Sequence, residues 1–102
     1  LESDFVLVTG IADSQPLISY LKSKKYKFNH IRYNDHHIYN QNDIKEIIKS
    51  SGNKIILTTK KDYFKIISLH DSNNLFYIDI KIDFFGKSND LVGLISEKFS
   101  LN

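Results

Sequence analysis

The sequence of 102 residues contains no cysteine, methionine or tryptophan and only one proline. Without cysteine, neither a disulfide framework nor a thiolate metal site can form, and this fits a reducing compartment. No apolar run reaches the roughly 20 residues that a membrane-spanning helix needs. The first residues also lack the basic and then apolar pattern of a signal peptide. The length corresponds to a single domain that can bury its own core.

Neither sign of charge dominates the sequence. Fourteen basic and 12 acidic residues give a formal net charge of +2, and the acids are interspersed among the lysines. The aromatic residues fall mostly on apolar faces, whereas a platform for single-stranded nucleic acid needs basic residues interleaved with them on one exposed face. We therefore expect no nucleic acid among the partners.

Short apolar runs alternate with helical patterns along the whole chain. The runs Phe5–Ile11 and Lys54–Thr58 are typical of strands buried on both faces of a parallel sheet. The alternation over Tyr26–Tyr33 predicts a strand near an edge. We also expect one strand, or two joined by a bend, over Leu75–Ile80 and Lys81–Phe85.

Four helices are predicted from capping residues and from apolar residues at helical spacing. The first begins at Ser14, with Leu17, Ile18 and Leu21 facing inward. The second begins at Asn40 and Asp43, ends at Gly52 and has Ile44, Ile47 and Ile48 facing inward. The third begins at Thr59 and Asp62 with Phe64 and Ile67 on one face, and the fourth begins at Ser88 with Leu91, Val92, Ile95 and Phe99 buried. Strands alternating with helices through short loops predict an α/β domain with a mostly parallel sheet flanked by helices, a Rossmann-like three-layer sandwich.

Polar residues cluster in the loops that follow three of the predicted strands. These loops are Gly10–Asp13, Asp35–His37 and Thr58–Asp62. Parallel strands place their carboxyl ends at one edge of a sheet, and α/β domains bind ligands there. We therefore expect the three loops to share that edge.

Chemistry alone leaves the roles of these polar residues open. The Asp35–His37 loop fits a catalytic or metal-binding site, because imidazole exchanges protons and binds metals near neutral pH. Taken alone, however, it fits a solvated capping loop better, because neighbouring histidines on a turn are common. Thr59 and Asp62 have the spacing of a helix cap. Lys61 has no capping role, and at this edge it could meet a phosphate as a point charge.

Three strings carry a resemblance to a known family. They are VLVTGIA (Val6–Ala12) followed by Gln15-Pro16, then Asp35-His36-His37, then TTKKD (Thr58–Asp62). Their order and spacing resemble the second domain of the tetraacyldisaccharide 4′-kinases, and the resemblance covers nearly the whole chain. It implies that residues 1–102 are the carboxy-terminal α/β domain of a two-domain kinase. The phosphate-binding loop G-x-x-x-x-G-K-[ST], which that family carries in its first domain, occurs nowhere in this sequence.

The resemblance also implies a reaction. The intact enzyme is expected to use ATP and Mg²⁺ to phosphorylate the 4′-hydroxyl of a tetraacyldisaccharide 1-phosphate in lipid A biosynthesis. Its partners would be its own amino-terminal P-loop domain, the lipid A disaccharide precursor and the cytoplasmic face of the bacterial inner membrane. We expect this chain alone to be soluble and inactive and to bind no ATP or metal.

Site residues follow from the resemblance position by position. His36 is expected to assist a catalytic aspartate of the missing first domain, with Asp35 in support, whereas His37 is expected to be structural. Thr59, Lys61 and Asp62 are expected near the nucleotide or substrate.

The sequence departs from the family pattern at two places. Asp13-Ser14 stands where the family usually has a proline, and Lys60 stands where it usually has glutamate. The second departure removes a favourable charge from the first turn of a helix, worth about 0.3–1 kcal/mol at an exposed site.

Two other classes of function remain open. A metal-dependent phosphoesterase fits the Asp35–His37 loop, but a two-metal site needs further acids or histidines, and the other two loops offer only Asp13 and Asp62. A non-catalytic, receiver-like interaction domain would need aspartate, threonine and lysine on separate strands. Here Thr59, Lys61 and Asp62 share one turn.

Overall fold

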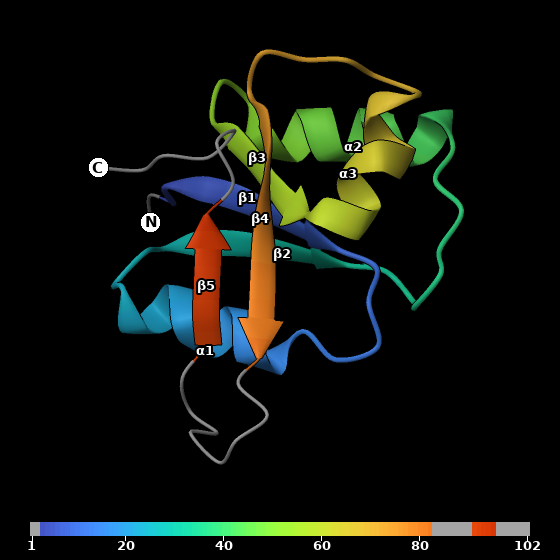
Figure 1. Cartoon of the computed structure of the whole chain (residues 1–102). Coiled ribbons are helices and arrows are strands. Elements are labelled where there is room, and N and C mark those ends of the chain that lie inside the picture. The colour runs from blue at the N-terminus through green and yellow to red at the C-terminus, as the bar shows by residue number, and fades with distance from the viewer. Residues whose placement is uncertain (1–2, 83–90, 96–102) are drawn as a thin grey trace.

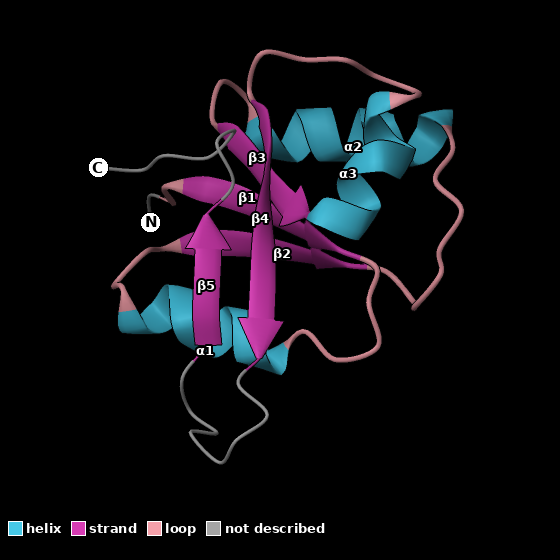
Figure 2. Cartoon of the chain, in the orientation of Figure 1, coloured by secondary structure: helices cyan, strands magenta, loops and turns pink. Residues whose placement is uncertain are grey.

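A computed structural model of the chain describes residues 3–82 and 91–95. Five strands form one sheet in the order β2-β1-β3-β4-β5, with three helices packed on it (Figures 1 and 2). The elements are β1 Phe5–Thr9, α1 Gln15–Ser23, β2 Phe28–Arg32, α2 Gln41–Ser51, β3 Ile55–Thr59, α3 Lys60–Ile67, β4 Leu75–Ile82 and β5 Leu91–Ile95.

The first four strands are parallel. β1 pairs with β2 and β3, and β3 pairs with β4. In register, Thr9 lies level with Arg32, and Thr58 lies level with Val8. The carboxyl ends of β1, β2 and β3 therefore meet at one edge, and the predicted α/β class with a mostly parallel sheet is confirmed.

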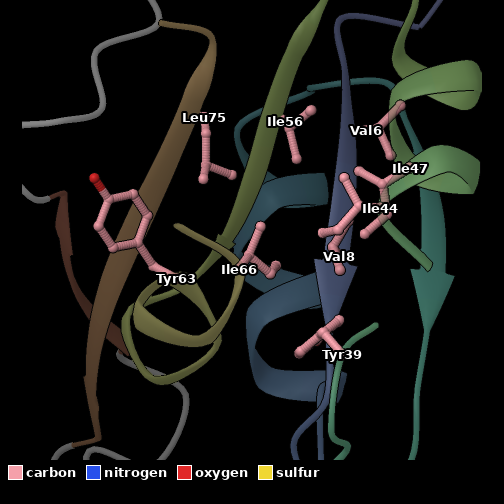
Figure 3. Close-up of a cluster of buried hydrophobic side chains, with 9 residues drawn as sticks. All are labelled: Val6, Val8, Tyr39, Ile44, Ile47, Ile56, Tyr63, Ile66 and Leu75. Atoms are coloured by element: carbon pink, nitrogen blue, oxygen red, sulfur yellow. The ribbon is translucent and has the colours of Figure 1, made fainter. Parts of the chain in front are cut away.

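Two hydrophobic clusters fill the two faces of the sheet. Successive residues of a strand point to opposite faces, so β1 sends Val6 and Val8 to one cluster and Phe5 and Leu7 to the other. The first cluster packs under α2 and α3, and nine of its side chains are drawn in Figure 3. The second packs under α1, on the opposite face. All four of these β1 side chains are fully buried, which explains the continuous apolar run in the sequence.

The caps of α2 and α3 lie where spacing predicted them. Asn40 and Asp43 form a reciprocal capping box, and Gly52, at φ 58°, ends α2. Thr59 caps α3 by accepting a hydrogen bond from the Asp62 N–H. At α1 the cap residue is Ser14, but its side chain makes no capping bond, and Asp13 Oδ1 instead accepts from Gln15 N at 3.0 Å.

Two residues predicted to face inward are exposed, although Ile44 and Ile47 of α2 are buried as predicted and Ile67 of α3 packs against the first cluster. Ile48 of α2 is 39% exposed and Phe64 of α3 is 59% exposed. In α3 the buried face consists of Asp62, Tyr63 and Ile66. This helix is turned so that the Asp62 carboxylate reaches the loop after β1, and that rotation carries Phe64 outward.

The predicted last helix is also wrong over its described part. Residues 91–95 form strand β5, antiparallel to β4, with Leu91 opposite Ile82 and Ile95 opposite Ile78. The run LVGLI contains two β-branched residues and a glycine, which disfavours a helix interior, and the free edge of β4 supplies hydrogen-bonding partners. The proposed cap Ser88, the proposed core residue Phe99 and the end of the predicted strand at Phe85 lie outside the described residues.

In the ranges 3–82 and 91–95, none of the helices has the length and apolar character needed to cross a bilayer.

Candidate functional site

The three polar loops meet at the carboxyl edge of the sheet, as predicted. Tyr33 N donates to Thr9 O at 2.7 Å, which places the end of β2 against the end of β1. His36 N donates to Gly10 O at 3.3 Å, and Gly10 N donates to Asp62 Oδ2 at 2.9 Å. Hydrogen bonds from backbone N–H groups therefore connect segments that are far apart in sequence into one surface.

His36 is the exposed histidine of this edge. Its side chain is 75% exposed, and its Nε2 lies 3.4 Å from Asp35 Oδ2. The backbone at His36 has φ 62°, a left-handed conformation that residues other than glycine adopt uncommonly, although asparagine, aspartate and histidine adopt it more often than most. The loop thus holds the imidazole outward in an unusual backbone conformation.

Lys61 lies between Asp35 and His36. Its Nζ is 3.4 Å from Asp35 Oδ1 and 3.3 Å from His36 Nδ1. An ammonium group can only donate, so Nδ1 is the acceptor and the ring proton sits on Nε2 in the neutral imidazole. This arrangement presents an Nε2–H donor next to the Asp35 carboxylate. Exposed ion pairs of this kind add little stability.

His37 faces inward and ties the loop to α2. Its Nε2 donates to Asp43 Oδ2 at 2.8 Å, the oxygen that also accepts the Asn40 N–H. The ring stacks on Tyr33 at 4.3 Å and meets Tyr39 edge to face at 4.9 Å. The two adjacent histidines therefore have different surroundings, one solvated and one packed.

Thr59 and Asp62 are buried, in contrast to the exposed side chains of Asp35, His36 and Lys61. Thr59 Oγ1 donates to Asp62 Oδ2 at 2.7 Å and accepts from Asp62 N at 3.1 Å. Asp62 is 0% exposed. Its carboxylate does not reach back to the Thr59 N–H as in a full capping box, because Oδ2 binds Gly10 instead. Asp62 is therefore not exposed at the surface of this edge.

Gly10 and Tyr39 complete the site from beneath. From the sequence, Gly10 was placed in one of the three loops without being given a role, and Tyr39 was not singled out. A Cβ at Gly10 would lie 3.0 Å from both Asp62 Oδ1 and the Tyr39 hydroxyl, and 3.3 Å from Asn34 O. Tyr39 lies at the carboxyl end of β1, next to Val8 (Figure 3). Burial, together with the neighbouring Asp62 carboxylate, raises the pKa of Tyr39, so its hydroxyl stays protonated.

Tyr39 and Asp62 face each other without a close hydrogen bond. The Tyr39 hydroxyl and Asp62 Oδ1 are both buried and unpaired within the described part of the chain. The Asp62 carboxylate lies close enough to help raise the pKa of Tyr39, so the phenol and the carboxylate attract each other. In the sequence, the only sign of this contact between Tyr39 and Asp62 was the position of Tyr39, an aromatic residue two positions after His37.

Comparison with known proteins assigns the chain to a family. The family model described as tetraacyldisaccharide-1-P 4′-kinase matches residues 1–100. The chain belongs to the tetraacyldisaccharide-1-P 4′-kinase family.

Named relatives carry the same description. The chain is similar to the tetraacyldisaccharide 4′-kinase of Cytophaga hutchinsonii, with 32% identity over 91% of this chain and 29% of that protein. It is similar to the Flavobacterium psychrophilum protein of that name, with 36% identity over 74% of this chain and 22% of that protein. The chain thus spans less than a third of the length of these relatives. No solved structure is significantly similar to it.

The described residues of this edge do not form a cluster of metal ligands. Among the residues that the structure describes, no three histidine or acidic side chains lie close enough together to hold a metal ion. Asp13 binds the start of α1 and Asp62 is buried against Gly10, so neither joins Asp35 and His36 in a ligand set.

Proposed function

We propose that this chain is the second domain of an ATP-dependent kinase that phosphorylates the 4′-hydroxyl of tetraacyldisaccharide 1-phosphate in lipid A biosynthesis. Membership of the family supports the reaction. The share of the relatives that the chain spans supports its being one part of a larger enzyme. The intact enzyme would work at the cytoplasmic face of the bacterial inner membrane, where its lipid substrate is presented.

The chain by itself is proposed to be inactive. Its sequence has no G-x-x-x-x-G-K-[ST] loop to cradle a triphosphate, and its described residues include no metal-ligand cluster. The residues present therefore do not fit ATP and Mg²⁺ as a binding site of their own. Both would be held by an amino-terminal P-loop domain, and this chain would contribute side chains from its carboxyl edge when the two domains close.

The exposed imidazole of His36 is the observation that carries this proposal. Lys61 occupies Nδ1, so Nε2–H is the free donor, and it already lies beside a carboxylate, that of Asp35. In the closed kinase an aspartate of the first domain would take a similar place. A hydrogen bond from Nε2 would orient that aspartate as it accepts the proton of the 4′-hydroxyl.

The other predicted site residues, Lys61, Thr59 and Asp62, differ in how far they are buried. Lys61 is half exposed, with its ammonium group on the surface, and we propose that it faces the phosphates of the nucleotide as a point charge. Thr59 and Asp62, which lie on either side of Lys61 in the sequence, are buried. Phosphoryl transfer depends mainly on positioning and charge stabilisation, so a second domain can contribute through a few such groups.

Calorimetric titration with ATP and Mg²⁺ tests the division of labour. The chain alone should give no saturable heat at micromolar concentrations, and the intact two-domain protein should bind. A phosphoryl-transfer assay with tetraacyldisaccharide 1-phosphate should detect product only with the intact protein. Micromolar ATP binding by the chain alone would contradict the proposal, as would an intact protein that fails to phosphorylate this lipid.

A further inference from the structure

Gly10 joins a buried carboxylate to the exposed histidine. Its N–H donates to Asp62 Oδ2 at 2.9 Å, and its carbonyl accepts the His36 N–H at 3.3 Å. A chain of two hydrogen bonds thus runs from α3, through a single residue after β1, to the backbone of His36.

The Asp62 end of this chain is fixed. The residue is fully buried, and its Oδ2 also accepts the Thr59 hydroxyl at 2.7 Å. The backbone N–H of Asp62 in turn donates to Thr59 Oγ1. Two donors on one oxygen of a buried carboxylate restrict its movement, because losing either of them leaves the carboxylate less well compensated in a medium of low dielectric.

Gly10 transmits this constraint because it is closely packed. Asp62 Oδ1, the Tyr39 hydroxyl and Asn34 O all lie within 3.3 Å of the place where a Cβ would be. The loop that contains His36 therefore rests directly on the Gly10 backbone. A shift of Gly10 would move the loop with it.

The backbone of His36 needs such an anchor. Its left-handed φ of 62° is unfavourable for a residue with a side chain. The side-chain contacts of His36 with Asp35 and Lys61 are at the surface, where such pairs hold geometry weakly. The bond to Gly10 is the one that reaches the interior.

We propose that Asp62 is a positioning residue for His36. It acts through the Gly10 backbone, without touching nucleotide or lipid, and it fixes where the His36 imidazole stands at the domain edge. This inference rests on the role proposed above for His36, and it replaces direct contact with nucleotide or substrate as the function of Asp62.

Substitutions at Asp62 differ in whether they keep an acceptor for the Gly10 N–H. In Asp62→Asn the side-chain carbonyl can still accept from Gly10 N and Thr59 Oγ1, while its amide faces Tyr39. Asp62→Ala removes the acceptor and should release Gly10. Ile66→Ala is the matched control, because Ile66 is buried on the same face of α3 but packs in the hydrophobic cluster under α2 and α3.

Amide hydrogen exchange of this chain, measured by NMR, tests the link without any enzyme assay. In Asp62→Ala the amides of His36 and Gly10 should exchange about tenfold faster or more, measured relative to the amides of β1 and β3. The strand amides serve as the reference because they report global unfolding, so the ratio isolates local opening of the loop. Asp62→Asn should restore their protection. Ile66→Ala should accelerate all these amides together. If Asp62→Ala does not fold, Asp62→Ser, whose hydroxyl is too short to reach Gly10, replaces it.

The intact kinase tests the consequence. Asp62→Ala should lower kcat at least tenfold with the KM for ATP unchanged, whereas Asp62→Asn and Ile66→Ala should keep kcat within about threefold. Unchanged His36 exchange in Asp62→Ala would overturn the inference, as would equal kcat losses in Asp62→Ala and Ile66→Ala. If exchange responds as expected but neither His36→Asn nor Asp62→Ala changes kcat, the link stands and the proposed role of His36 fails.

Discussion

The Asp62 carboxylate and the Gly10 backbone N–H are joined by a hydrogen bond of 2.9 Å across 52 residues of sequence. This bond connects the start of α3 to the loop after β1, two segments that lie side by side because β1 and β3 pair in parallel. It makes a helix-capping acid part of the framework of the candidate site. The loops of this edge are therefore coupled through the interior as well as through their surface contacts.

Gly10→Ala should destabilise the chain by about 1–3 kcal/mol, the usual cost of overpacking a tight interior. The added Cβ would lie 3.0 Å from Asp62 Oδ1 and from the Tyr39 hydroxyl, so one of them must move. Urea unfolding measures the change. Gly52→Ala is the comparison for a different cause: nothing lies within 4 Å of its added Cβ, so any loss of stability there comes from its positive φ alone. A Gly10→Ala chain that unfolds at the wild-type urea concentration would refute the close approach.

His36→Asn should leave the stability of the chain within about 0.5 kcal/mol, as for other exposed positions, because asparagine tolerates the left-handed backbone. In the intact kinase the same change should lower turnover about 10²-fold, the contribution expected from a general acid–base partner. Thermal unfolding and steady-state assays measure the two effects.

His37→Ala is the matched comparison in the same loop. It removes the 2.8 Å bond to Asp43 and the stacking on Tyr33, and should destabilise the chain by about 1–2 kcal/mol. Turnover of folded intact enzyme should fall much less than for His36→Asn. Equal losses of turnover in the two variants would mean that the Asp35–His37 loop has only a structural role.

Thr59→Ala should destabilise the chain by about 1–2 kcal/mol, through loss of the N-cap and of one donor to the buried Asp62 carboxylate. Thr59→Ser keeps the hydroxyl and should recover most of that stability. The two variants are compared by chemical denaturation. If alanine and serine behave alike, the hydroxyl is not the group that holds α3.

Acidification should destabilise the chain in part through His30. Burial, and secondly the Arg32 charge, lower the pKa of His30, and its Nε2 bonds Thr9 Oγ1 at 2.8 Å. The unfolded chain therefore binds a proton at higher pH than the folded chain does. The stabilising effect is complete above the unfolded pKa of about 6.5 and is lost as pH falls through it towards the lower folded pKa.

The variant His30→Asn cannot titrate at this position and isolates that effect. Its free energy of unfolding should fall less than that of the wild type between pH 7.5 and pH 5. The difference between the two chains, measured by urea unfolding across this range, should be in that direction. A steeper pH dependence in His30→Asn would mean that the folded state favours the charged imidazole.

The local parts of this fold could be predicted from sequence, and the tertiary parts only partly. The caps at Asn40 and Thr59 follow from contacts three residues apart, so spacing identifies them. The same spacing cannot show that Asp43 returns to its own cap whereas Asp62 binds Gly10, because that choice depends on how α3 meets β1. The run Leu91–Ile95 fits either a helix or a strand by composition, and pairing with the edge of β4 decides between them.

The candidate site shows the same division. Alternating strands and helices predicted that the loops with His36 and Lys61 would share an edge, because parallel topology determines it. Topology could not show that Lys61 lies against His36 Nδ1 or that neighbouring His37 turns inward. Those outcomes depend on the left-handed backbone at His36, which the sequence does not mark with a glycine.

Lys60 has a partner that accounts for a basic residue in the first turn of α3. Its Nζ lies 3.8 Å from Asp79 Oδ2 on strand β4, so a neighbouring acid offsets the unfavourable positive charge at the start of the helix. In evolutionary terms, the residues at these two positions should vary together. Family members with glutamate at the first position would place two acids side by side if they kept aspartate at the second, so we expect a neutral or basic residue there.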